Sequence, residues 1–147
     1  MTTYYFFDTS ALVKRYHVEA GSDKVDEVFD DEEGVFLISE LTIVELASAL
    51  QRKQNRGEVT ATDVDNALAL FAASVLRDLI VVGFSSGFIQ QARTLVLEHN
   101  LRTLDALQLT AVLEFESLAP VFVCADDRLA DAAEAIGFTV LNPQLSF

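Results

Sequence analysis

The amino-acid sequence predicts an α/β fold built from βα units around a parallel sheet. Short apolar runs, bounded by polar residues or glycine, alternate along the chain with longer segments in which apolar residues recur at helical spacing. The 147-residue length corresponds to one domain, residues 1–147, with a sizeable core. A hydrophobic content of 51% excludes an intrinsically disordered chain.

Five apolar runs are predicted to be largely buried strands, because they are too short and too rich in β-branched and aromatic residues to be helices. They span residues 3–7, 35–39, 80–82, 121–125 and 139–141. Helices are expected at residues 10–16, 22–30, 42–56, 60–77, 86–99, 103–116 and 127–136. Two of them begin with a sequence that resembles a capping box, Thr42 to Glu45 and Thr60 to Asp63, and Gly137 stands where a helix C-cap is expected.

The charge balance limits the ways in which this protein can bind other molecules. Ten Lys and Arg residues face 23 Asp and Glu residues, which gives a net charge of −13. Such a chain does not bind nucleic acid through its overall charge, so any contact of that kind must be local. Cys124 is the single cysteine and cannot form an intrachain disulfide. With no signal-peptide pattern and no apolar run approaching the ~18 residues of a membrane span, we expect a cytoplasmic protein without a membrane segment.

Four acidic residues occupy similar positions relative to the predicted elements. Asp8, Glu45 and Asp126 follow predicted strands, and Asp105 lies in the first turn of a helix that is apolar on nearly every face. Each acid also has a purely structural explanation. Asp8 is a typical N-cap, Glu45 fits its capping box, Asp105 suits the helix dipole, and either Asp126 or Asp127 caps the helix that follows.

Considered together, the four acids favour a metal site. In a parallel sheet these positions share the edge at the carboxyl ends of the strands, where ligands of such folds bind. Converging carboxylates repel one another and raise one another's pKa unless a cation neutralises them. No His or Cys ligand set accompanies the acids, so we expect Mg²⁺ or Mn²⁺ and not Zn²⁺.

The segments that carry these acids resemble, in order and spacing, the motifs of the PIN domain, in particular those of the VapC toxins of toxin–antitoxin pairs. They are residues 7–14 (FDTSALVK), 41–50 (LTIVELASAL), 101–109 (LRTLDALQL) and 123–129 (VCADDRL). The resemblance implies a three-layer α/β/α sandwich with strand order 3-2-1-4-5. It also implies a metal-dependent ribonuclease whose acidic pocket contains Asp8, Glu45, Asp105 and Asp126, with Ser10 as the small hydroxyl residue beside the first acid. Cys124 departs from the Thr or Ser usual at its position, which puts one supporting hydrogen bond in doubt.

Among the four acids, we expect Asp8 and Asp105 to bind the metal directly, and Glu45 and Asp126 to bind it directly or through water. A cation held in this way can activate water and neutralise charge during phosphodiester hydrolysis. The resemblance further implies an RNA substrate, a homodimer and a VapB-like antitoxin whose C-terminal segment covers the pocket. The apolar segment 64–76 is a candidate dimer interface, although core packing explains it equally well.

The densest basic stretch, Arg52, Lys53 and Arg56, is the first candidate surface for RNA, and Lys14 with Arg15 is the second. The simpler explanation of the first stretch is a solvated helix C-terminus, where cations suit the dipole.

Two other enzyme classes fit poorly. A haloacid-dehalogenase-type phosphatase needs a second Asp where this chain has Ser10, and a response-regulator receiver needs a late Lys, whereas no Lys follows Lys53. The serious alternative is a PIN-like interaction or RNA-binding module with little turnover.

Overall fold

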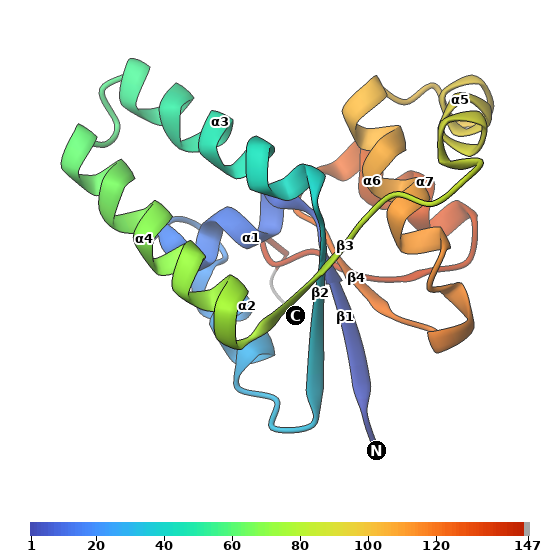
Figure 1. The fold of residues 1–147 in the computed structure, drawn as a ribbon, viewed down its shortest axis with the longest axis horizontal. Coiled ribbons are helices and arrows are strands. Elements are labelled where there is room, and N and C mark those ends of the chain that lie inside the picture. The colour runs from blue at the N-terminus through green and yellow to red at the C-terminus, as the bar shows by residue number, and fades with distance from the viewer. Residues whose placement is uncertain (146–147) are drawn as a thin grey trace.

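A computed structural model describes residues 1–145 of the chain. Its centre is a five-stranded parallel sheet with the order β3-β2-β1-β4-β5, and helices cover both faces of the sheet (Figure 1). The parallel α/β fold that the sequence predicts is therefore confirmed, as are the three-layer sandwich and the strand order that the resemblance to PIN domains implies.

The sheet is built around its first strand. The strands are β1 (Thr3–Phe7), β2 (Gly34–Ser39), β3 (Leu79–Val82), β4 (Val121–Val123) and β5 (Thr139–Leu141). Strand β1 lies between β2 and β4, and its last residue, Phe7, is opposite Ile38 on one side and Val123 on the other. All neighbouring strands run parallel, so the chain leaves every strand at the same edge of the sheet.

Each helix lies within a few residues of its predicted position. The helices are α1 (Thr9–Tyr16), α2 (Ser22–Phe29), α3 (Leu41–Asn55), α4 (Ala61–Arg77), α5 (Phe88–His99), α6 (Thr103–Leu113) and α7 (Asp127–Ala135). Helix α6 ends before the predicted boundary, and a short 3₁₀ helix (Glu116–Leu118) follows it. No helix within residues 1–145 is both long and apolar enough to cross a membrane.

The sheet divides the core into two halves because successive strand side chains point to opposite faces. Phe6 and Phe122 pack with α5, α6 and α7 on one face, and Phe7 and Val123 pack with α1 to α4 on the other; all four are fully buried. Burying a Phe side chain contributes about 3 kcal/mol, so these central strands anchor both layers.

The prediction that all strands are largely buried is wrong at the edges of the sheet. Ile80 on β3 is 51% exposed, and Thr139 on β5 is exposed as well. These strands have one hydrogen-bonded neighbour each, so their outer sides are not covered by another strand.

The helix-start signals have different outcomes. Thr60 and Asp63 form the predicted capping box at the start of α4, and Gly137 follows α7 with a positive φ of 105°. The capping box predicted at Thr42 is wrong because α3 already begins at Leu41. Thr42 is instead buried inside the first turn, whereas Ile43, which helical periodicity places on the buried face, is 44% exposed.

Candidate active site

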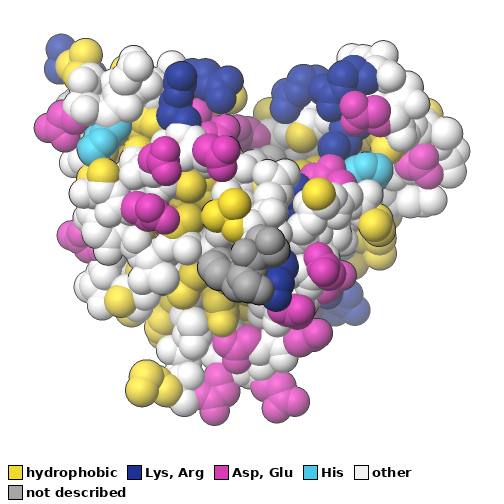
Figure 2. All heavy atoms as spheres, turned by 180° about the vertical axis from the view of Figure 1, so that it is seen from behind, with side chains coloured by type: hydrophobic (Ala, Val, Ile, Leu, Met, Phe, Trp, Pro, Cys, Tyr) yellow, Lys and Arg dark blue, Asp and Glu magenta, His cyan; other side chains and the backbone are white. Residues whose placement is uncertain are grey.

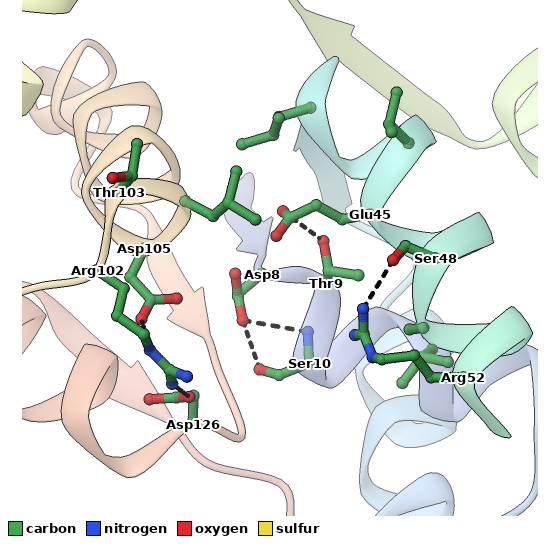
Figure 3. A pocket seen from close by; sticks show the side chains of 15 residues that line it. Asp8, Thr9, Ser10, Glu45, Ser48, Arg52, Arg102, Thr103, Asp105 and Asp126 are labelled. Atoms are coloured by element: carbon green, nitrogen blue, oxygen red, sulfur yellow. Dashed lines mark hydrogen bonds and ion pairs between the residues drawn. The ribbon is translucent and has the colours of Figure 1, made fainter. Parts of the chain in front are cut away.

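All five residues predicted for the site line one cavity of about 620 Å³ at the carboxyl edge of the sheet (Figure 3). The segments that follow β1, β2 and β4, together with the first turn of α6, bring them together. The five residues are Asp8, Ser10, Glu45, Asp105 and Asp126. The convergence predicted from the sequence is therefore present, whereas the metal and catalytic roles of these residues stay predictions.

Asp8 lies at the bottom of the cavity, directly after the central strand β1, and is only 5% exposed. Its Oδ2 accepts hydrogen bonds from the backbone N–H of Ser10 at 3.1 Å and from the Ser10 hydroxyl at 2.5 Å. Asp8 is thus the N-cap of α1 as well as a wall of the cavity. One side chain therefore serves both as a helix cap and as part of the predicted site.

Ser10 links the first acid to the turn that carries the last one. Its hydroxyl oxygen accepts a 3.0 Å hydrogen bond from the backbone N–H of Ala125, directly before Asp126. Cys124, which departs from the family pattern, is buried with its Sγ 3.9 Å from Asp8 Oδ2. Burial, and next the charge of Asp8, raise the pKa of the Cys124 thiol, so it stays protonated and is only a weak donor.

Glu45 belongs to a buried polar network that joins α1, α3 and α6. The Gln108 side-chain amide donates to Glu45 Oε1 at 2.6 Å and to Thr42 Oγ1 at 2.8 Å, and Thr9 Oγ1 donates to Glu45 Oε1 at 3.0 Å. Gln108 and Thr42 are fully buried. The carboxylate of Glu45 is therefore fixed by two donors from other helices.

Asp105 and Asp126 face each other across the guanidinium group of Arg102. Arg102 Nε lies 3.4 Å from Asp105 Oδ2, and Arg102 Nη2 lies 3.5 Å from Asp126 Oδ2. Asp126 also caps α7 by accepting from the Leu129 N–H at 3.0 Å. The sequence predicts that one acid of the pair at 126 and 127 caps and the other faces the site; Asp126 does both, because its two oxygens point in different directions.

The cavity disfavours ionised carboxylates. Burial raises the pKa of Asp8 to about 6, against the opposing hydrogen bonds from Ser10, and the charges of Glu45 and Asp105 add to the rise. Burial also raises the pKa of Glu45, even though Gln108 and Thr9 donate to it. For Asp105, burial and the nearby charge of Asp126 raise the pKa, and Arg102 opposes them. Such a site gains stability when a cation enters it.

The donors present suit a hard cation, although they are not arranged as a finished cage. Carboxylate oxygens are the ligands that Mg²⁺ and Mn²⁺ prefer. Asp105 Oδ2 is buried without a hydrogen-bond partner, because the contact with Arg102 does not have hydrogen-bond geometry. Within residues 1–145, no three His, Cys, Asp or Glu side chains are grouped closely enough to hold an ion as they stand.

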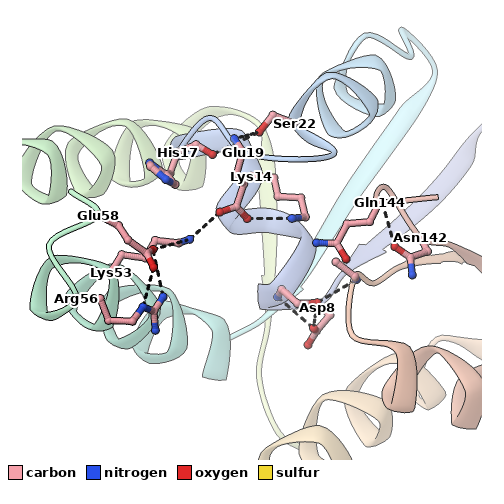
Figure 4. A network of polar contacts seen from close by, with 12 residues as sticks. Asp8, Lys14, His17, Glu19, Ser22, Lys53, Arg56, Glu58, Asn142 and Gln144 are labelled. Atoms are coloured by element: carbon pink, nitrogen blue, oxygen red, sulfur yellow. Dashed lines mark hydrogen bonds and ion pairs between the residues drawn. The ribbon is translucent and has the colours of Figure 1, made fainter. Parts of the chain in front are cut away.

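Most of the predicted basic surface is neutralised by neighbouring acids (Figure 4). Lys53 Nζ lies 2.7 Å from Glu19, and Arg56 forms an ion pair with Glu58 at 2.8 Å. The second candidate surface for RNA is neutralised as well. Lys14 is buried with its Nζ 2.9 Å from Glu19, and Arg15 forms an ion pair with Asp26 at 2.6 Å.

Of the first predicted basic stretch, Arg52 lines the acidic cavity. Its Nη1 donates to Ser48 Oγ at 2.7 Å on the same helix.

Two site residues are not predicted from the sequence. Arg102 and Gln108 flank Asp105 within the motif of residues 101–109, but the pattern of acids assigns no role to either. Gln108 carries a signal, since a polar residue in a helix that is apolar on nearly every face must find a buried partner. No such sequence signal marks Arg102, because its contact with Asp126 forms only when the fold brings the two residues together.

Comparisons with known proteins identify the family of this chain. The family model described as PIN domain matches residues 5–135. Ribonuclease VapC35 of Mycobacterium tuberculosis is 30% identical over 141 residues, which cover 94% of this chain and 96% of that protein.

Similar folds occur in several solved structures. PAE2754 from Pyrobaculum aerophilum has a TM-score of 0.67 at 22% identity and covers 95% of this chain and 83% of its own. VapC20 of Mycobacterium tuberculosis, described as a sarcin–ricin loop cleaving toxin, has a TM-score of 0.68 at 17% identity and covers 91% and 95%. VapBC2 from Rickettsia felis, bound to a promoter DNA fragment, has a TM-score of 0.62 at 15% identity and covers 95% and 98%. The fold, the order of the acidic motifs and the family match lead to one conclusion: this chain belongs to the PIN domain family.

Proposed function

We propose that this protein is a metal-dependent endoribonuclease that hydrolyses RNA phosphodiester bonds, and that it is the toxin of a toxin–antitoxin pair. The observation that carries the proposal is the cavity in which carboxylates from four separate segments meet. The relative named Ribonuclease VapC35, similar over nearly the whole of both chains, supports RNA as the substrate class.

Asp8 and Asp105 would hold the cation, because Asp8 is the most buried of the four acids and Asp105 has a buried oxygen without a hydrogen-bond partner. Glu45 and Asp126 would complete the shell directly or through water, since Mg²⁺ keeps part of its hydration. When bound, the cation lowers the pKa of a water molecule and neutralises charge on the phosphoryl oxygens.

The chain's own residues organise this chemistry before any ligand arrives. Ser10 holds Oδ2 of Asp8, and Gln108 with Thr9 holds Oε1 of Glu45, so neither carboxylate is free to rotate. Fixed carboxylates orient an attacking water without reorganisation during the reaction. The shielded position of Asp8 also excludes competing solvent from the innermost part of the site.

Cleavage of total RNA in Mn²⁺ or Mg²⁺ tests the proposal. We expect cleavage by the wild-type protein, none in excess EDTA, and none by Asp8→Asn or Asp126→Asn. Asp127→Asn is the matched control, because Asp127 adjoins Asp126 but accepts from Asn142 and does not line the cavity. Equal cleavage by Asp8→Asn, or by wild type in EDTA, rejects the metal mechanism. RNA binding without cleavage would support the alternative of an interaction module.

We also propose an antitoxin partner and a homodimer. VapBC2 of Rickettsia felis supports the partner as a class. Leu70 and Leu76 are exposed on α4, while Val64 and Phe71 of the same helix are buried, so part of the candidate interface is core and part is available for contact. Light scattering of the purified chain, alone and co-expressed with the product of the adjacent gene, measures both assemblies. A monomer in the first sample contradicts the dimer, and no complex in the second contradicts the partner.

A further inference from the structure

Two arginines are the basic side chains that line the acidic cavity, and they lie on opposite walls of it (Figure 3). Arg52 comes from α3, and Arg102 comes from the residue directly before α6. Space-filling atoms show Lys and Arg side chains on both sides of the notch between the two helical layers, with acidic side chains also near it (Figure 2). A polyanion that crosses the acidic floor therefore meets a cation at each rim.

The net negative charge of the protein makes the cations at these two positions important for RNA binding. With a net charge of −13, the protein repels RNA at long range, so binding requires cations close to the cleavage position. Lys53 and Arg56, which the sequence suggests for this role, are paired with Glu19 and Glu58. Arg52 contacts a neutral hydroxyl, that of Ser48, so its charge is not cancelled by that contact.

Arg102 is held differently, because its present partners are the two carboxylates proposed to bind metal. The contacts with Asp105 and Asp126 are 3.4 and 3.5 Å long, and the Arg102 side chain is 71% exposed. Long contacts to an exposed side chain are weak and easily exchanged. Since an arginine remains charged at all ordinary pH values, Arg102 and a divalent cation compete for the same oxygens.

We propose that Arg52 and Arg102 bind the RNA phosphates on either side of the cleavage position, and that Arg102 leaves Asp105 and Asp126 to do so. Guanidinium groups bind phosphate oxygens in a bidentate manner, and the released carboxylates become ligands for the cation. Arg102 thus neutralises the acidic pocket until the metal takes its place at the carboxylates and an RNA phosphate becomes its new partner. The inference rests on the proposed ribonuclease function, and it assigns the residues that position the substrate.

Two binding measurements test the assignment. The first is the affinity for a fluorescein-labelled single-stranded RNA of mixed sequence, measured at low salt without added metal in the Asp8→Asn background, with RNA integrity checked on a denaturing gel. We expect Arg52→Ala and Arg102→Ala each to weaken binding about fivefold to tenfold. Each should also reduce the slope of log K against log salt by about 0.7 for every phosphate that the variant no longer neutralises.

The second measurement is the affinity for Mn²⁺ alone, by calorimetry, with Asp8 intact. Arg102→Ala should bind Mn²⁺ severalfold more tightly, because the competing guanidinium is gone. Arg52→Ala should raise this affinity less, because the Arg52 charge acts on Glu45 only from a distance, without an ion pair. Opposite effects of one substitution on the two ligands distinguish exchange from a general loss of structure. Arg102→Lys retains a positive charge and should restore part of the RNA affinity.

Matched controls come from the same helices or their neighbours. Arg56→Ala removes the same charge directly after α3, from a residue that pairs with Glu58 outside the cavity, and Arg93→Ala removes an exposed cation from α5. Both should leave RNA and Mn²⁺ affinities near wild type. If Arg52→Ala and Arg102→Ala bind RNA like these controls, or if Arg102→Ala does not bind Mn²⁺ more tightly, the inference is overturned. If the variants give either of these results while the wild type still cleaves RNA, only the inference about the two arginines is refuted. A wild type that cleaves no RNA in the presence of metal refutes the proposed function itself.

Discussion

The side-chain amide of Gln108 donates a 2.6 Å hydrogen bond to the carboxylate of Glu45, although the two residues are 63 positions apart. Gln108 is fully buried on α6, and Glu45 lines the cavity from α3. The bond therefore joins the two helical layers directly above the edge of the sheet, and it holds one acid of the proposed active site in place.

Gln108→Met keeps the volume of the side chain but removes the donor. The Glu45 carboxylate and the Thr42 hydroxyl then lose their shared partner, which we expect to destabilise the protein by about 1–3 kcal/mol. RNA cleavage should fall as well, because Glu45 is no longer fixed. Urea unfolding measures the first effect, and Gln51→Met, an exposed substitution on α3, is the control. Equal stabilities of the two variants would contradict a structural role for this bond.

The raised pKa of Asp8 predicts an unusual pH dependence for the stability of the metal-free protein. Its folded-state pKa, about 6, is above the ordinary 3.8, so the folded protein binds this proton more tightly than the unfolded chain. The stabilisation is complete below the unfolded pKa and is lost as the pH rises through about 6, a difference of about 3 kcal/mol at neutral pH. The raised pKa values of Glu45 and Asp105 act in the same direction.

Asp8→Asn removes this titration and keeps an N-cap, since Asn caps helices as well as Asp does. In EDTA, the variant should therefore be more stable than wild type at neutral pH and should lose less stability as the pH rises from about 5 to about 7. Urea unfolding across this range measures the difference, with the exposed Asp131→Asn as the control. Parallel pH profiles for wild type and Asp8→Asn would show that burial does not perturb this carboxyl.

Glu19 is the centre of a second polar network, away from the cavity (Figure 4). Burial alone would raise the pKa of its carboxyl, but hydrogen bonds from Lys53 and Lys14 outweigh that effect and hold the pKa below its ordinary value. The Lys14 side chain is 3% exposed, so Glu19 supplies the charge that its ammonium group needs.

Glu19→Gln should destabilise the protein by about 3 kcal/mol, because it leaves a buried ammonium without a counter-charge. Glu58→Gln removes a surface ion pair with Arg56 and a longer contact of 3.8 Å with Lys53, and it should change the stability little, because Glu58 is exposed. Thermal and urea unfolding of the two variants measure the difference. A loss no larger for Glu19→Gln than for Glu58→Gln would mean that Lys14 finds another partner or solvent.

Much of this protein can be predicted from local sequence patterns. The alternation of apolar runs with helical segments gives the βα units, and acids placed at strand ends or helix starts give the cavity, because parallel strands deliver their ends to one edge. Asp8 shows this most clearly: its place directly after the central strand specifies both the helix cap and the floor of the cavity.

Some predictions fail because a residue contacts a partner that is distant in the sequence. The sequence around Thr42 resembles a capping box, yet burial against Gln108 gives this residue a different partner. Lys53 looks like part of a basic surface, yet Glu19, 34 positions away, neutralises it. Local propensity contains no information about such partners, since they are chosen by packing between segments far apart in the chain.

Residue spacing along the chain is enough to predict the fold class, the position of each acid relative to its strand or helix, and the family. The groups that hold those acids became known from the folded arrangement: Gln108 holds Glu45, and Arg102 contacts Asp105 and Asp126. A hydrogen bond or ion pair requires contact within a few ångströms, and that contact exists only after the sheet has brought the helices of its two faces to a common edge.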